Sequence, residues 1–247
     1  MKKRIFAIII LFIVLVAIVW KDDIFARIPG RGYMSVKMAG ADEMTQRTEG
    51  RGLKKIDDPL RILYNNHEMA FDAREKKYYV TQNMNNAMWD GFFSCSRGQL
   101  YWEEDRYFTQ PLEAIADGHV FKLYCIDEKA GEYMLYQIVF TGMPTMTIHT
   151  ESGKPIADEA QGAAMHLANM KFGGREWESS ACKVAVRGQS SRGFPKQGYK
   201  LVLDQKKSLL GMRKDEDWIL AALWDDDGLI HNKFSYDVWR NIASGNS

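Results

Sequence analysis

Residues 184–239 restrict the possible folds more than any other part of the chain, because strand, loop and helix signals follow one another there in a fixed order. A strand that ends at Arg187 is followed by a small polar loop, a basic strand, Trp218 and an acidic turn that leads into a helix. The three parts read RGQSSRGFPKQGYKLVL, KSLLGMRKDEDWIL and DDDGLIHNKFSYDVW. A segment with this many ordered parts can adopt few alternative structures.

The loop that begins at Arg187 has the composition of a phosphate cradle. Gly188 and Gly193 allow positive φ and close approach of the backbone to a ligand. Arg187, Arg192 and Lys196 place three cations within ten residues. The spacing differs from a Walker A loop and from the G-x-G-x-x-G loop of ordinary kinases. A hairpin loop with solvated cations is the structural alternative to phosphate binding.

The strand after this loop alternates between apolar and polar positions. Tyr199 and the two leucines after it are predicted to face a core, whereas Lys196 and Lys200 face the opposite side. A kinase needs a cation on a strand beside the phosphate loop to hold the α- and β-phosphates. Either lysine can fill that role.

Together these motifs resemble the spore-coat protein H (CotH) kinase family, whose members carry an RG-x-[ST]-SR-x-[FY]-PKKSY-like loop and strand followed by a D-x-x-[LM]-[IM]-RNK-[LF] helix. The resemblance covers residues 145–242. It implies that residues 151–247 are the N-terminal part of an atypical kinase lobe, with antiparallel strands and a carboxyl-terminal helix. The expected activity is transfer of the ATP γ-phosphate, with Mg²⁺, to Ser or Thr of a surface or spore-coat protein.

The resemblance also assigns candidate nucleotide-binding residues. We favour Lys196 over Lys200 as the phosphate-binding cation, because Lys196 matches the first lysine of PKKSY. Gln197 and Gly198 replace the second lysine and the serine. His231 stands where the family has arginine, and a solvated helix face is an equal interpretation of Lys233. The full candidate set is Arg187, Gly188, Ser190, Ser191, Arg192, Lys196, Lys200, Asn232 and Lys233.

No catalytic residue or metal ligand is assigned, because the family's catalytic and metal-binding acids lie downstream of the RNK helix. We therefore expect a chain that is the first part of a longer protein and is inactive by itself. Asp225, Asp226 and Asp227 are interpreted as a helix start, with Asp227 as the cap of a helix from Gly228, rather than as a metal cluster. Its predicted buried stripe contains Ile230, Phe234, Val238 and Ile242.

The N-terminus carries a membrane signal. Lys2, Lys3 and Arg4 precede an uncharged run at residues 5–20, and an A-x-A cleavage pattern is absent. We expect residues 1–21 to be a signal anchor that spans the cell membrane once and leaves the bulk of the chain outside the cytoplasm. A cleaved signal peptide and a buried helix of a soluble protein are the alternatives. Residues 22–57, which are punctuated by glycines, are predicted to be a flexible linker.

Residues 58–150 are predicted to form an all-β, sandwich-like module. Short strand signals at residues 59–64 and 77–81 are separated by turn signals at Asn65 and Asp72. Residues 119–126 and 132–140 indicate a hairpin around residues 127–131, and residues 111–117 a short helix. We expect most aromatic side chains here to form the core, with a sugar-stacking platform as the alternative. The overall expectation is an α+β protein: membrane helix, sandwich-like module and partial kinase lobe.

Composition excludes some functions. The net charge of +1, from 33 basic and 32 acidic residues that are interspersed, gives no reason to expect nucleic acid as a partner. The three cysteines and five histidines lack the spacing of a zinc site. Cys95 and Cys125 form a disulfide or stay free. The alternative function is a cell-surface binding or adhesion module in which the CotH-like segment is a scaffold.

Overall fold

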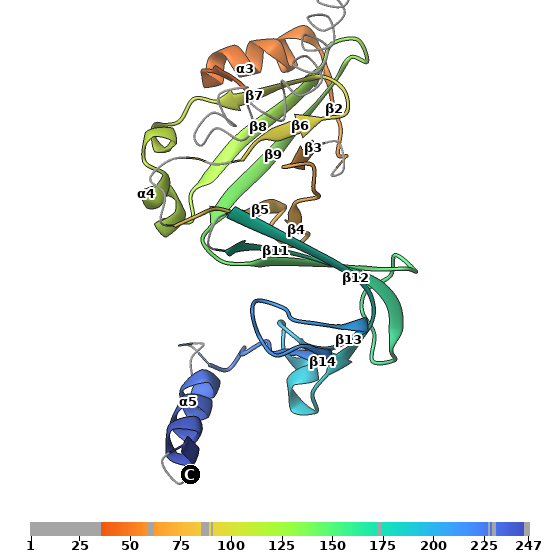
Figure 1. The fold of residues 1–247 in the computed structure, drawn as a ribbon. Helices are drawn as coiled ribbons and strands as arrows, with labels where there is room; N and C mark the ends of the chain where they lie inside the picture. The colour runs from red at the N-terminus through yellow and green to blue at the C-terminus, as the bar shows by residue number, and fades with distance from the viewer. Residues whose placement is uncertain are drawn as a thin grey trace, which may run out of the picture. The chain divides into compact units, whose positions relative to one another are not determined.

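The computed structural model describes residues 36–58, 62–84, 89, 91–171, 174–226, 228 and 231–244, which are mostly β-strands with few helices (Figure 1). The predicted signal anchor at residues 1–21 lies outside the described residues. Among the residues that are described, no helix is long and apolar enough to cross a membrane. The predicted α+β class with a β-sandwich is therefore wrong for the described residues, which are predominantly sheet.

The described residues group into two compact units. One contains residues 36–145 and 168–176, and the other contains residues 146–167 and 177–244. The predicted boundary lay between residues 150 and 151. Residues 168–176, which belong to the first unit, include the end of β11 (Gln161–Lys171) and the start of β12 (Gly174–Arg187). The rest of both strands belongs to the second unit.

The first unit is built on a seven-stranded sheet in the order β1-β7-β8-β9-β5-β4, with β2 paired to β9. Three of its pairings are parallel, those of β1 with β7, β5 with β9 and β2 with β9. A separate two-stranded sheet pairs β3 with β6. The mixed sheet replaces the predicted sandwich, because turn and alternation signals locate strands without specifying their partners. The strands are β1 (Lys37–Ala39), β2 (Lys54–Lys55), β3 (Ile62–Tyr64), β4 (Ala70–Asp72), β5 (Lys77–Thr81), β6 (Phe93–Cys95), β7 (Gln99–Glu103), β8 (Val120–Asp127) and β9 (Glu132–Thr141).

Part of the predicted linker belongs to this unit. Besides β1 and β2, it contains α3 (Ala41–Arg47) and the 3-10 helix η2 (Glu49–Arg51). Met44 of α3 is fully buried and packs in a cluster with Tyr101, Ile126 and Tyr133. Burying one such side chain stabilises by about 1.5–3 kcal/mol, which is enough to hold a short helix against a sheet.

The predicted hairpin and short helix are both present. β8 and β9 pair antiparallel from Val120 opposite Val139 to Asp127 opposite Glu132. Asp127 closes the turn by accepting the backbone N–H of Ala130 at 3.1 Å, and Gly131 adopts a φ of 69°. Before β8 lie η3 (Arg106–Thr109) and α4 (Pro111–Ala116).

Aromatic side chains form the core of the first unit, as predicted for most of them. Trp89 contacts Phe140 with ring centroids 4.4 Å apart, and its indole N–H donates to the Phe108 carbonyl at 2.7 Å. Trp102 is fully buried and meets Phe93 edge to face at 5.2 Å. Rings buried in this way pack against one another and are not available for stacking on a sugar.

The second unit contains a five-stranded sheet in the order β10-β11-β12-β13-β14. Its core is formed by Met165, Val184, Leu201 and Leu203, with Tyr199 packed against them. The predicted alternation after the basic loop is thus confirmed. The elements are β10 (Thr145–Thr150), β11 (Gln161–Lys171), β12 (Gly174–Arg187), η4 (Ser190–Gly193), β13 (Gly198–Lys207), β14 (Asp215–Leu220) and the helix α5 (His231–Ser244).

Two further sequence expectations concern side chains. Cys95, Cys125 and Cys182 form no disulfide bond, so the predicted disulfide alternative is not the one in this structure. Three residues of the predicted buried stripe are instead exposed, at 68% for Phe234, 39% for Val238 and 58% for Ile242, and Ile230 lies outside the described residues. A period of four in a sequence identifies an apolar face, whereas burial depends on a second surface that covers it.

Candidate phosphate-binding loop

The basic loop, which we define as residues 187–197, connects β12 to β13. Arg187, the last residue of β12, pairs with Gly198, the first residue of β13, and so closes the hairpin. Gly188 has a φ of 120°, and a Cβ there would lie 2.0 Å from Oγ of Ser191. The loop conformation therefore requires glycine at this position. After η4, the side-chain amide of Gln197 donates to the Arg192 carbonyl at 2.7 Å.

The cations that the sequence singled out differ in their partners. Arg192 Nη1 lies 3.4 Å from Oδ2 of Asp158, and Lys200 Nζ lies 3.0 Å from Oδ1 of Asp217. Arg187 and Lys196 are both exposed, and within the part of the chain that the structure describes neither forms an ion pair. The positive charge available to a ligand at this hairpin thus belongs first to Arg187 and Lys196.

The connection between β10 and β11 contacts the start of the basic loop. The Val186 N–H donates to the Ala157 carbonyl at 2.8 Å, one residue before the ion pair that Asp158 makes with Arg192. Sequence reasoning missed both residues. Asp158 lies far from Arg192 in the chain, in a polar segment with no motif, so only tertiary structure could find the pair.

The structure describes the remaining site candidates in less detail. Ser190 is exposed and Ser191 is partly buried at the start of η4. Asn232 and Lys233 lie in the first turn of α5, but their side chains are outside the described residues. The structure therefore unites the residues of the hairpin and gives no contact between them and these two helix residues.

The acidic turn before α5 differs from its predicted geometry. The helix begins at His231 rather than at Gly228, and Asp227, the predicted cap, lies outside the described residues. Asp226 is buried and its Oδ1 accepts the Gly228 N–H at 3.1 Å. A carboxylate that accepts a nearby backbone N–H stabilises a turn, so Gly228 lies in a turn rather than in the helix.

The CotH kinase protein family model matches residues 184–246. The predicted family resemblance is confirmed for this segment. The match begins within β12 and extends through α5, so it contains the whole basic loop. No curated protein and no solved structure matches the chain. We call residues 184–246 the CotH segment.

The described residues of the CotH segment offer groups for a phosphate but no cluster of metal ligands. Exposed guanidinium and ammonium groups bind phosphate oxygens through charge-assisted hydrogen bonds. Over the residues that the structure describes, no group of three or more His, Cys, Asp or Glu side chains can hold a metal ion. The described residues therefore fit the triphosphate of ATP and do not supply a set of Mg²⁺ ligands.

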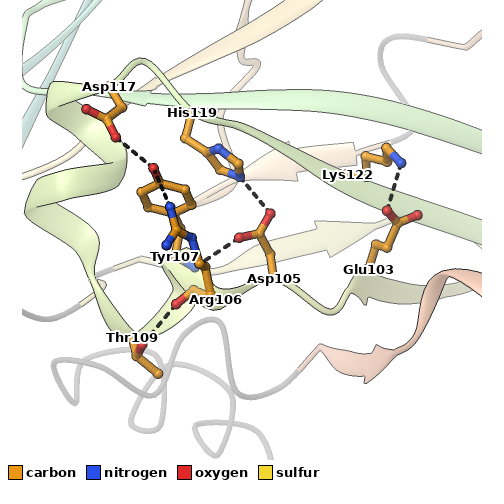
Figure 2. Close-up of polar contacts among 8 residues, drawn as sticks. All are labelled: Glu103, Asp105, Arg106, Tyr107, Thr109, Asp117, His119 and Lys122. Carbon is orange, nitrogen blue, oxygen red and sulfur yellow. Dashed lines mark hydrogen bonds and ion pairs between the residues drawn. The ribbon is translucent and has the colours of Figure 1, made fainter.

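A second polar group lies in the first unit, near the start of β8 (Figure 2). Asp105 accepts the Tyr107 N–H at 2.9 Å, and its Oδ2 lies 2.6 Å from Nε2 of His119. The Tyr107 ring stacks on His119, and its hydroxyl donates to Asp117 at 2.7 Å, which holds the pKa of Tyr107 above its ordinary value. These contacts tie η3 and α4 to β8, which is a structural role.

Proposed function

We propose that the CotH segment binds the phosphates of ATP through the basic loop and belongs to a kinase. The reaction is transfer of the γ-phosphoryl group to a Ser or Thr hydroxyl of a partner protein, such as a surface or spore-coat protein. One observation carries the proposal: the segment that matches the CotH kinase protein family contains a hairpin loop in which the exposed Arg187 and Lys196 form no ion pair with any described residue.

Phosphoryl transfer depends on positioning and charge stabilisation more than on covalent chemistry. Lys196 lies within the loop itself, and its ammonium group is exposed. Lys200 lies on β13, where Asp217 already offsets its charge. Lys196 is therefore the stronger candidate for the cation that holds the nucleotide.

Arg192 has a supporting role in the proposal. An exposed ion pair such as that with Asp158 contributes only about 0.2–1 kcal/mol, because water screens both charges. The guanidinium can exchange this carboxylate for a phosphate at little cost, since phosphate carries more charge and, like a carboxylate, accepts two parallel hydrogen bonds. In this proposal Asp158 orients Arg192 before the phosphate binds.

Substitution of the two lysines tests the proposal. ATP binding to the chain of residues 1–247 would be measured by isothermal titration calorimetry for the unaltered chain, Lys196→Ala and Lys200→Ala. We expect weak binding that falls about tenfold or more in Lys196→Ala, because a hydrogen bond to a charged group contributes about 1.5–3 kcal/mol. Lys200→Ala, the matched control, should change the affinity by about twofold or less.

Three outcomes would contradict the proposal. Unchanged affinity in Lys196→Ala would refute the loop assignment, and equal losses in both variants would indicate nonspecific attraction between ATP and any nearby cation. Absence of ATP binding to the unaltered chain would favour a surface binding or adhesion module. Thermal melts of the variants should stay close to that of the unaltered chain, since exposed lysines contribute little to stability.

A further inference from the structure

Two histidines come together on the exposed face of the five-stranded sheet. His149 lies on β10 and His166 on the adjacent β11, with ring centroids 6.0 Å apart and ring planes inclined by 60°. Both side chains are exposed, whereas the neighbours Met165 and Leu167 point into the core. The pleat of the sheet therefore directs both imidazoles to the same side, away from the core.

The distance between the two ring centroids is suitable for two imidazoles that bind the same metal ion. A Zn–N bond is about 2.0–2.1 Å long, so two rings on one tetrahedral ion have centres roughly 5–6 Å apart. The observed centroid distance lies at the upper end of this range, and a small side-chain rotation closes the difference. Each imidazole has two ring nitrogens, so a hydrogen bond at one leaves the other for the ion.

A hydroxyl group orients one of the two rings. Oγ of Ser179, on β12, lies 2.9 Å from Nδ1 of His166. Metal-bound histidines commonly use one ring nitrogen for such a contact, which fixes the ring and leaves the other nitrogen for the metal. At His166 this leaves Nε2.

Water can reach an ion held between the two rings, because both imidazoles are exposed. The nearby depression of about 360 Å³, which is lined by His166, Ser179, Asp204 and Lys207, lies toward β12 and β13 and does not include His149. Solvent water on the exposed face of the sheet, rather than this depression, therefore supplies the remaining ligands.

We propose that His149 and His166 form a binding site for a divalent late transition metal ion, with water as the remaining ligands and Ser179 as a positioning residue. Imidazole selects Zn²⁺, Cu²⁺ or Ni²⁺, whereas Mg²⁺ prefers oxygen ligands, so the site is distinct from any magnesium that accompanies ATP. The ion joins β10 to β11. These strands flank the connection that carries Asp158, the partner of Arg192.

Zinc titration tests the site. Zn²⁺ binding to the chain of residues 1–247 would be measured by competition with a chromophoric chelator. The variants are His149→Ala, His166→Ala and Ser179→Ala, with His67→Ala and Cys95→Ser as controls at other possible zinc ligands. We expect one saturable site whose affinity falls at least about tenfold in each histidine variant and less in Ser179→Ala. The two controls should bind as the unaltered chain does, and excess Mg²⁺ should not compete.

The proposal fails if Zn²⁺ shows no saturable binding, or if His149→Ala and His166→Ala both retain the affinity of the unaltered chain. It also fails if Cys95→Ser or His67→Ala removes the binding, since the ion would then lie elsewhere. Circular dichroism of each variant should match the unaltered chain, because both histidines are exposed and their removal leaves the core intact.

Discussion

At the scale of single residues, the basic loop depends most on Gly188. Its φ of 120° falls in a region that side chains disfavour, and the space that a Cβ would occupy is taken by Ser191. Gly193 in the same loop has nothing within 4 Å of a built Cβ and needs no special φ. Two glycines that look equivalent in the sequence therefore have different roles.

We expect Gly188→Ala to lower the free energy of unfolding by about 1–3 kcal/mol, because it combines a strained backbone with a steric clash. Gly193→Ala, the matched control, should change it by about 0.5 kcal/mol or less. Urea unfolding curves of both variants would measure the difference. Equal effects would mean that the loop adopts another conformation.

At the scale of elements, the apolar face of β13 is buried, whereas the apolar face of α5 is exposed. Leu201 on β13 is fully buried in the core of the second unit, where it lies opposite Trp218 of β14. On α5, Phe234 and Trp239 are each 68% exposed. Exposed apolar patches of this kind mark interaction surfaces, or surfaces that promote aggregation.

The chain should therefore bind a hydrophobic fluorescent dye through α5. We expect dye fluorescence to fall by about half in the double variant Phe234→Ser and Trp239→Ser, with a change in stability of about 0.5 kcal/mol or less. Leu201→Ala should instead cost about 2–5 kcal/mol in chemical unfolding, since it opens a cavity in the core. Dye binding that persists in the double variant would place the exposed patch elsewhere.

At the scale of the whole molecule, the tyrosines of the first unit control its response to alkaline pH. Burial raises the pKa of Tyr78. Burial also raises the pKa of Tyr124, and the hydrogen bond that its hydroxyl donates to Glu103 adds to the effect. A raised folded-state pKa means that the neutral phenol is favoured in the folded state. The stability that each neutral phenol contributes to the folded protein is complete below the unfolded-state pKa of about 10. This contribution is lost as the pH rises above that pKa.

The melting temperature should accordingly fall by several degrees as the pH is raised from about 8.5 to about 11, because unfolded tyrosines release protons that the folded ones retain. Differential scanning calorimetry over this range would measure the fall. Tyr124→Phe should reduce the slope, since one of the responsible hydroxyls is removed. A melting temperature that does not change with pH would contradict this assignment.

Location in the cell membrane stays a prediction that rests on residues 1–21 alone.

The sequence by itself determined the local elements and the family segment. The β8–β9 hairpin follows from Asp127 and Gly131, whose side-chain hydrogen bond and positive φ define the turn within a few residues. The alternation of β13 likewise follows from the period of two, which fixes which side chains share a face. The CotH motifs also lie within one continuous stretch of chain.

Only the tertiary structure decided which distant segments meet. The parallel pairing of β1 with β7, the ion pair between Arg192 and Asp158, and the approach of His149 to His166 all join residues that lack a shared local pattern. Strand register and the packing of buried side chains such as Met44 select these partners from many alternatives of similar local energy. Local chemistry therefore specifies turns and faces, whereas pairing across the chain depends on the burial that the complete fold provides.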